Sequence, residues 1–182
     1  MNSEAIPGEQ VALRPFHPGD AAALLDAVVE SGSTLSRYET WARPGFTLED
    51  AQEYVDWWIV SRESGSAHYF AIEGPEGRFL GACGLSGIDR AHRCAGLGFW
   101  VRTSASGRGV ASEAAGLVVR FGFEHLGLER VEVMAAVDNA ASRRVAEKTG
   151  ARLEGILRHR LVLEDVPTDA VLYAVLREDL PG

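Results

Sequence analysis

The stretch Ser106–Ser112 reads SGRGVAS, and it separates a strand-like run, GLGFWV, from a helix-like run that begins with Glu113. Glycines let a backbone approach a ligand closely, and the first turn of a helix has N–H groups without partners. A strand, a glycine-spaced turn and a helix start therefore predict an anion cradle suited to a pyrophosphate. A tight turn whose glycines serve geometry alone is an equal alternative. Neither the Walker spacing nor GxGxxG is present.

A second polar pair, Asn139 and Ser142, lies at the start of the next predicted helix. One interpretation makes Asn139 an N-cap and Ser142 a first-turn residue. The other is functional. Parallel pairing of GLGFWV with RVEVMAAV (Arg130–Val137) would place both helix starts at the same end of the sheet, where ligands of open α/β sheets bind.

The rest of the chain alternates strand-like and helix-like segments, which predicts a mixed α/β fold in one domain over residues 1–182. Apolar patterning and turn residues predict the strands Val11–Phe16, His68–Glu73, Arg78–Ile88, Gly96–Arg102 and Arg130–Val137, and two long strands around the turn EDVPTD. Capping patterns predict helices from Asp20 to about Glu30, after Thr47-Leu-Glu-Asp50, from the glycine turn to Gly127, and from DNAAS to Gly150.

The composition narrows the function classes. A net charge of −8 argues against nucleic acid as the main partner, because phosphate binding requires a basic surface. Two cysteines are too few for a disulfide framework, and the five histidines show no metal-ligand spacing, so we expect no metal. The first residues lack a basic start and an apolar run, so we expect a cytoplasmic protein that does not associate with membranes.

The ordered motifs resemble the GNAT superfamily of acyl-CoA-dependent N-acetyltransferases, in particular its RimJ/RimL-type branch. The superfamily motif Gln/Arg-x-x-Gly-x-Gly/Ala corresponds to Ser106–Ala111, and the branch continuation Thr/Ser-Glu-Ala to Ser112–Ala114. The later pattern Asn-x-x-Ser, then Glu-Lys-x-Gly, appears as Asn139, Ser142 and Glu147–Gly150. Together with VALRPF near the start and LEGILR near the end, the resemblance covers nearly the whole chain.

Two positions depart from the family pattern. Ser106 replaces the usual Gln or Arg, which removes a side-chain contact near the pyrophosphate. Gly96 stands where the branch often has a Glu, so a catalytic base cannot be carried over from that position. The resemblance implies a GNAT-like fold, with a central, mostly antiparallel twisted sheet of about seven strands, splayed fourth and fifth strands, and about four flanking helices.

The resemblance also implies that acetyl-CoA is the cosubstrate and lies where the fourth and fifth strands splay apart. A bulge near Phe99–Arg102 would free main-chain groups, and the N–H of Trp100 or Val101 would stabilise the oxyanion. Backbone N–H groups across Gly107–Ser112 would hold the pyrophosphate, with Arg108 adding charge. The implied cofactor-binding residues are Phe99, Trp100, Val101, Arg102, Gly107, Arg108, Gly109, Val110, Ala111, Ser112, Asn139 and Ser142.

Three residues are candidates for catalysis. Ser142 would hydrogen-bond the leaving thiolate, with a capping-turn role as the equal alternative. Glu39 lies in the irregular segment YETW, which by position could line the acceptor cleft. Glu132, on the fifth strand, is a second candidate base, although a solvent-facing strand residue is the favoured interpretation. A water chain is a third option for the base.

The implied reaction is direct attack of a neutral amine on the thioester in a ternary complex. An α-amine has a reference pKa of about 7.7–8.0 and a lysine of about 10.4, so a protein or peptide N-terminus needs less help to lose its proton. A small-molecule amine is the alternative acceptor. A non-catalytic acyl-CoA-binding module is a third hypothesis, and the resemblance is compatible with a homodimer.

Overall fold

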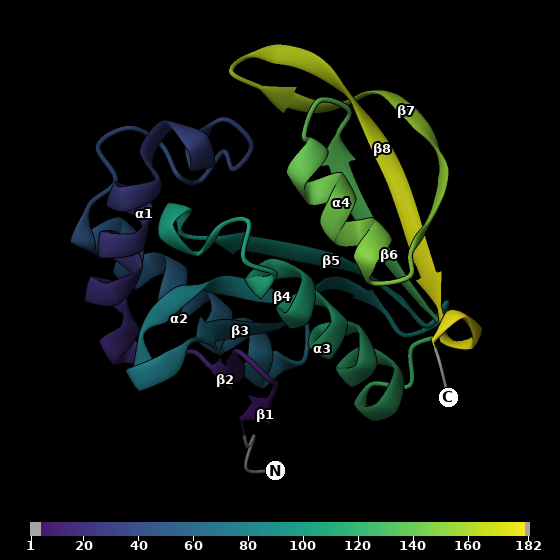
Figure 1. Cartoon of the computed structure of the whole chain (residues 1–182), viewed down its shortest axis with the longest axis horizontal. Helices are drawn as coiled ribbons and strands as arrows, with labels where there is room; N and C mark the ends of the chain where they lie inside the picture. The colour runs from purple at the N-terminus through teal and green to yellow at the C-terminus, as the bar shows by residue number, and fades with distance from the viewer. Residues whose placement is uncertain (1–4, 181–182) are drawn as a thin grey trace.

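A computed structural model describes residues 5–180 of the chain (Figure 1). In this part of the chain, eight strands form one sheet in the order β1-β2-β3-β4-β5-β6-β8-β7. The strands are β1 (Ile6–Pro7), β2 (Ala12–Pro15), β3 (His68–Glu73), β4 (Phe79–Asp89), β5 (Cys94–Val101), β6 (Arg130–Ala136), β7 (Arg152–Leu163) and β8 (Val166–Leu176). The α-helices are α1 (Ala21–Ser36), α2 (Leu48–Ser64), α3 (Val110–His125) and α4 (Ala140–Lys148).

The predicted mixed fold with a mostly antiparallel sheet is confirmed. All neighbouring strands pair antiparallel except β5 and β6, which pair parallel as the sequence predicted. The sheet has one strand more than expected because the two-residue β1 adds to the edge of β2. The parallel pairing joins Cys94–Leu97 to Arg130–Val133 and then stops. Beyond it β5 and β6 diverge, which confirms the predicted splay (Figure 1).

The predicted bulge near Phe99–Arg102 is wrong. The β4–β5 register runs without a shift from the pair Ser86/Gly96 to the pair Gly81/Val101, and its irregularity lies at the other end of β5, beside Cys94. The edge of β5 beyond Leu97 is free for a different reason. Because β6 turns away to pair with β8, no described strand covers that edge of β5.

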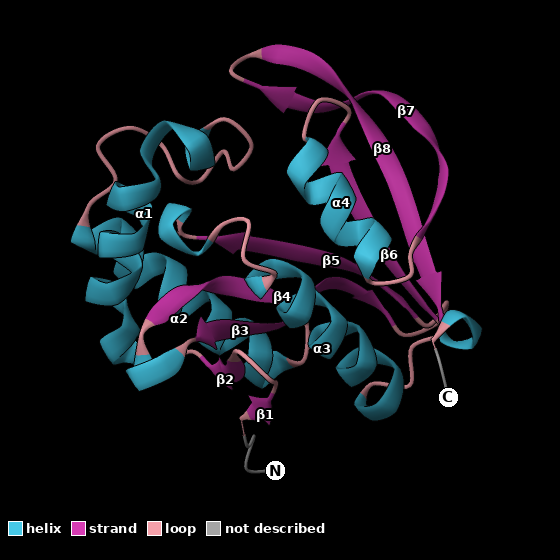
Figure 2. Ribbon diagram, in the orientation of Figure 1, coloured by secondary structure: helices cyan, strands magenta, loops and turns pink. Residues whose placement is uncertain are grey.

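Helices cover both faces of the sheet, each over its own apolar core (Figure 2). One core buries Val118 and Val119 of α3 against strands, and Ala146 of α4 joins it. The other buries Leu24 of α1 and Val55 of α2, together with a group of aromatic side chains. The glycine turn between β5 and α3 therefore crosses from the sheet to a helix that is firmly packed.

Local sequence signals set the helix ends. The capping box of α2 is confirmed, because Asp50 N donates to Thr47 Oγ1 at 3.2 Å and Thr47 N donates to Asp50 Oδ2 at 2.8 Å. Gly127 follows α3 with a φ of 67°, as expected of a C-terminal cap. Helix α1 extends beyond the predicted end near Glu30, but it is kinked at Gly32, where φ is 39°.

Among residues 5–180, no helix has the length and apolar character needed to cross a membrane.

Replacing Gly84 with alanine should destabilise the sheet. A Cβ at this position of β4 would lie 2.4 Å from Tyr69 Cα and 2.5 Å from the His68 carbonyl oxygen, and backbone atoms cannot move aside. We expect a loss of about 1–3 kcal/mol in the free energy of unfolding, measured by urea denaturation. Gly116→Ala is the matched control, because a Cβ there meets nothing within 4 Å. It should stabilise α3 by about 0.5–1 kcal/mol, and equal losses in both variants would contradict the close approach.

Candidate active site

A cavity of about 480 Å³ lies where β5 leaves β6. Its walls come from α1, the end of β5, the loop that leads to α3, the first turn of α3, and α4. The lining residues that the sequence predicted are Glu39, Phe99, Trp100, Val101, Gly107, Gly109, Val110, Ala111, Ser112, Asn139 and Ser142. The structure thus brings together most of the predicted site.

A second cavity of about 130 Å³ lies between the diverging strands and the β7–β8 hairpin. Leu97, Gly98 and Phe99 line it from β5, and Leu161 and Leu163 line it from β7. The two cavities have five lining residues in common, which are Tyr38, Glu39, Phe99, Asn139 and Ser142. A group in one cavity can therefore meet a group in the other at these residues.

The glycine turn has the geometry of an anion cradle. Gly107 and Gly109 have φ values of 73° and 88°, a backbone region that favours glycine. A Cβ on Gly107 would meet no heavy atom within 4 Å, so the turn faces open space. Helix α3 begins at Val110, so the N–H groups of its first turn have no partner within the helix, and Val110–Ser112 of that turn line the cavity. Arg108 is exposed beside the turn and is not among the lining residues.

The capping interpretation of Asn139 and Ser142 is confirmed, and the functional one stays a prediction. Asn139 Oδ1 accepts a hydrogen bond from Ser142 N at 3.1 Å, which caps α4. Both residues also line the two cavities. The cap uses the main-chain N–H of Ser142, so it leaves the hydroxyl available to the junction of the cavities.

The backbone direction of β5 separates the two candidates for the oxyanion site. The N–H of Arg102 donates to the Leu80 carbonyl of β4 at 2.8 Å. Successive residues of a strand direct their N–H groups to opposite edges. The N–H of Val101 therefore points away from β4 and toward the splayed side, whereas that of Trp100 points to β4. Val101 is the better placed of the two.

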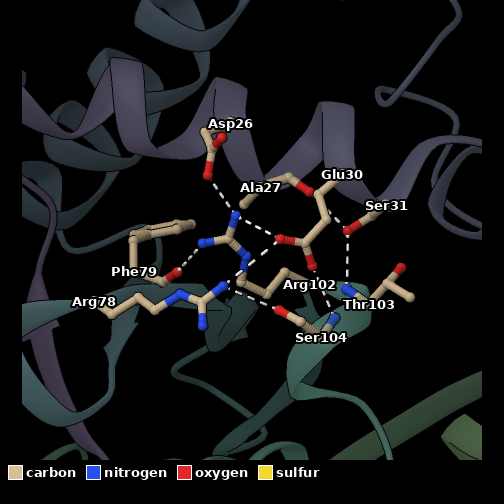
Figure 3. A network of polar contacts seen from close by, with 9 residues as sticks. All are labelled: Asp26, Ala27, Glu30, Ser31, Arg78, Phe79, Arg102, Thr103 and Ser104. Carbon is tan, nitrogen blue, oxygen red and sulfur yellow. Dashed lines mark hydrogen bonds and ion pairs between the residues drawn. The ribbon is translucent and has the colours of Figure 1, made fainter.

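The structure corrects the prediction that Arg102 binds the cofactor. Its side chain turns away from the cavity and is buried beneath α1 (Figure 3). The guanidinium forms ion pairs with Asp26 and with Glu30, the latter at 2.7 Å, and it donates to the Phe79 carbonyl at 3.2 Å. A buried cation needs such partners, so the Arg102 side chain stabilises the packing of α1 against the sheet and does not bind the cofactor.

The same network fixes α1 against the loop that precedes the glycine turn (Figure 3). Glu30 Oε1 accepts a hydrogen bond from Ser104 N at 2.8 Å, and Ser31 Oγ accepts one from Thr103 N at 3.2 Å. The hydrogen bond from Ser104 lowers the pKa of the Glu30 carboxyl, which keeps its charge opposite Arg102. Ser31 and Thr103 also line the larger cavity, so the network joins two segments of its wall.

Glu39 is a largely buried carboxyl in the lining that the two cavities share. Burial raises the pKa of its carboxyl to about 6, although a hydrogen bond from Trp41 Nε1 to Oε2, 2.8 Å long, acts in the opposite direction. Trp41 packs against Tyr54 and Trp100, as core packing predicts. Trp41 therefore holds Glu39 in place at the junction of the cavities, a second role that sequence reasoning missed.

Glu132 is not brought to the site. Its side chain accepts a hydrogen bond from Arg130 Nε at 2.8 Å, and Arg130 also pairs with Glu154 of β7. Glu132 lines neither cavity. The favoured sequence interpretation, a solvent-facing strand residue, describes Glu132 correctly.

Sequence reasoning also missed several lining residues. They come from α1, from α4 and from the β7–β8 hairpin, and include Ser31, Thr34, Leu35, Arg144, Val145, Lys148, Leu161 and Leu163. Helical spacing offered one signal, because Arg144 and Lys148 are four residues apart and share a helix face. The hairpin offered none, since its approach to Glu39 depends on the tertiary fold.

The described residues contain no group of three or more His, Cys, Asp or Glu side chains that could hold a metal ion. The expectation that the protein uses no metal stays a prediction.

Comparison with known proteins places the chain among the acyl-CoA-dependent acyltransferases. Residues 10–152 match the acetyltransferase (GNAT) domain family. YdaF of Bacillus subtilis, which carries the provisional name of a ribosomal N-acetyltransferase, is 27% identical over 96% of this chain and 95% of its own. A ribosomal-protein-serine acetyltransferase of Escherichia coli is 25% identical over 91% of this chain and 92% of its own. Mycobacterium smegmatis RimJ, solved with CoA-disulfide, is 27% identical with a TM-score of 0.85, covering 94% of this chain and 84% of its own.

The chain belongs to the GNAT acetyltransferase family, as the motif resemblance indicated. It is an N-acetyltransferase, and acetyl-CoA is its acetyl donor.

Two substitutions at the start of α4 should distinguish the capping role of Asn139 from a role of the Ser142 hydroxyl outside the fold. Asn139→Ala removes the capping oxygen and should cost about 1 kcal/mol in the free energy of unfolding. Ser142→Ala keeps the capped N–H and should change that free energy by less than about 0.5 kcal/mol. Thermal and urea unfolding measure both effects. A similar loss in the two variants would show that the Ser142 hydroxyl serves the fold.

Proposed function

We propose that the protein acetylates the α-amine of a peptide or protein N-terminus. The observation that carries this proposal is the shared lining of the two cavities, which places Glu39 and Ser142 where a donor in one cavity meets an acceptor in the other. The size of the larger cavity and its glycine cradle fit acetyl-CoA. The smaller cavity fits the terminal residue of a chain.

The donor side uses main-chain groups. The N–H groups of Gly107–Ser112 hold the pyrophosphate of acetyl-CoA, because a helix start and two glycines with positive φ present them together. Arg108 adds charge at the mouth of the cradle. Asn139 donates from its side-chain amide to the pantetheine arm, since its oxygen already serves as the cap of α4.

The transfer step uses groups at the end of β5 and the start of α4. The N–H of Val101 stabilises the negative charge that develops on the thioester oxygen. The Ser142 hydroxyl donates a hydrogen bond to the sulfur as the carbon–sulfur bond breaks, and the N-terminus of α4 favours the same negative charge. A fall in kcat in Ser142→Ala, with unchanged stability, reports this hydroxyl alone.

Glu39 accepts the proton that the attacking amine loses as the carbon–nitrogen bond forms. Its pKa of about 6 leaves it ionised at neutral pH yet more basic than an ordinary carboxylate. An α-amine has a reference pKa of about 7.7–8.0 and is partly neutral under the same conditions. The pair is therefore matched for proton transfer near pH 7.

The acceptor proposal is supported by the relatives named for ribosomal proteins and by the wall of the smaller cavity. Phe99, Met134, Leu161 and Leu163 contribute apolar side chains to a wall that also exposes polar atoms, and we expect a short uncharged side chain to lie against them beside the amine. We also propose that the protein acts in the cytoplasm, the compartment of ribosomal substrates. The expected homodimer, and the expected absence of nucleic-acid and membrane partners, stay predictions.

Thiol release from acetyl-CoA, measured across an acceptor panel, tests the proposed function. The panel contains peptides that begin with Ser or Ala, the same peptides with a blocked N-terminus but an internal lysine, and small amines. We expect turnover with the free α-amines and none with the blocked peptides. Preference for the small amines would replace the proposed acceptor. Binding of acetyl-CoA without turnover of any acceptor would favour a non-catalytic module.

Glu39→Gln should remove the rise in kcat/KM near pH 6 from the pH profile of the enzyme. In the wild type, kcat/KM should rise as the pH increases through about 6, because Glu39 must lose its proton before it can accept another. The variant should lose that limb and about 10²–10⁴ in kcat, while a limb near pH 8 from the acceptor amine persists. Glu132→Gln is the control and should keep the wild-type profile, because Glu132 pairs with Arg130 outside the cavities. An unchanged limb in Glu39→Gln would assign it to another group.

A further inference from the structure

We propose that Arg144 and Lys148 of α4 bind the 3′-phosphate of coenzyme A, so that the protein distinguishes coenzyme A from a coenzyme that lacks this group. The inference rests on the proposed donor site and deepens it. It adds a second phosphate-binding position to the backbone cradle.

The two side chains share a cavity with the cradle. Both line the larger cavity, which Gly109 and the first turn of α3 also line. They are four residues apart on α4, so they point from the same face of the helix. That face also carries Val145, which lines the same cavity between them. A ligand held by the cradle therefore has two cations in the lining of the same cavity.

Neither cation has a partner among residues 5–180, since no described carboxylate forms an ion pair with Arg144 or Lys148. Their neighbour Arg143 behaves differently, because it donates to Tyr173 Oη at 3.3 Å and to the Val137 carbonyl at 3.0 Å. In a chain of net charge −8, two unpaired cations on one cavity wall are available to an anion.

The chemical structure of coenzyme A indicates which of its anionic groups Arg144 and Lys148 bind. Backbone N–H groups at a helix start already satisfy a pyrophosphate. Coenzyme A carries one further phosphate, the dianionic monoester on its ribose. A guanidinium binds such a group through two parallel hydrogen bonds, and an ammonium adds a point charge. Because both side chains are exposed, solvent screens the attraction and the gain in affinity is moderate.

Titration calorimetry with coenzyme A and with 3′-dephospho-coenzyme A tests the inference. The wild type should bind coenzyme A about fivefold to twentyfold more tightly than the dephospho form, and the difference should shrink as salt is raised. The double variant Arg144→Ala/Lys148→Ala should lose that preference, because its affinity for coenzyme A falls to that for the dephospho form. Its affinity for the dephospho form should change by less than about twofold. Arg144→Lys, which keeps the charge, should retain part of the preference.

Arg120→Ala, which removes an exposed cation of α3 that does not line the cavity, is the matched control and should keep the wild-type preference. An equal loss for both coenzymes in the double variant would overturn the inference, because the cations would then serve the pyrophosphate or the fold. Full retention of the preference would overturn it as well. If the wild type bound neither coenzyme, the proposed donor site itself would fail, and the inference with it.

Discussion

The structure depends on a parallel pairing that ends early. Strands β5 and β6 share hydrogen bonds over Cys94–Leu97 and then separate, because β6 continues alongside β8. The separation exposes one edge of β5 without a bulge, and it opens the space that becomes both cavities. Parallel strands also send their following helices to the same end of the sheet, so the starts of α3 and α4 meet there. One departure from regular pairing therefore creates an unpaired strand edge and two converging helix starts.

The walls of the opening between β5 and β6 are joined by a network of polar contacts. The Arg102 guanidinium ties α1 to the strand end, and Glu30 and Ser31 accept the N–H groups of the loop that follows. Burying a cation and its carboxylate partners contributes little net stability compared with apolar packing. The network instead sets where α1 stands relative to the glycine cradle. Side chains that never touch the substrate thus determine the shape of its site.

Side chains outside the reaction centre also determine the electrostatics of Glu39. Aromatic packing around Trp41, Tyr54 and Trp100 excludes water and raises the pKa of the carboxyl, and Trp41 then orients that carboxyl through its indole N–H. A family position that often carries a Glu is Gly96 in this chain, and Glu39, the base that we propose instead, comes from a different segment of the cavity lining. Proton acceptance can move between positions because it requires only reach and a suitable pKa.

Local patterns in the sequence were enough for the helices and strands and for the glycine turn that begins α3. Strand periodicity, the capping box at Thr47 and the glycines of SGRGVAS each act through neighbouring residues, so their outcome does not depend on distant contacts. The tertiary structure decided the rest. In the sequence, Arg102 and Glu132 were candidates for the active site just as Glu39 was. In the structure, Arg102 forms ion pairs with carboxylates of α1, and Glu132 forms one with Arg130. Only the tertiary structure decides which charged groups form ion pairs, because the partners are far apart in the chain. The same holds for which side chains are buried and which line a cavity.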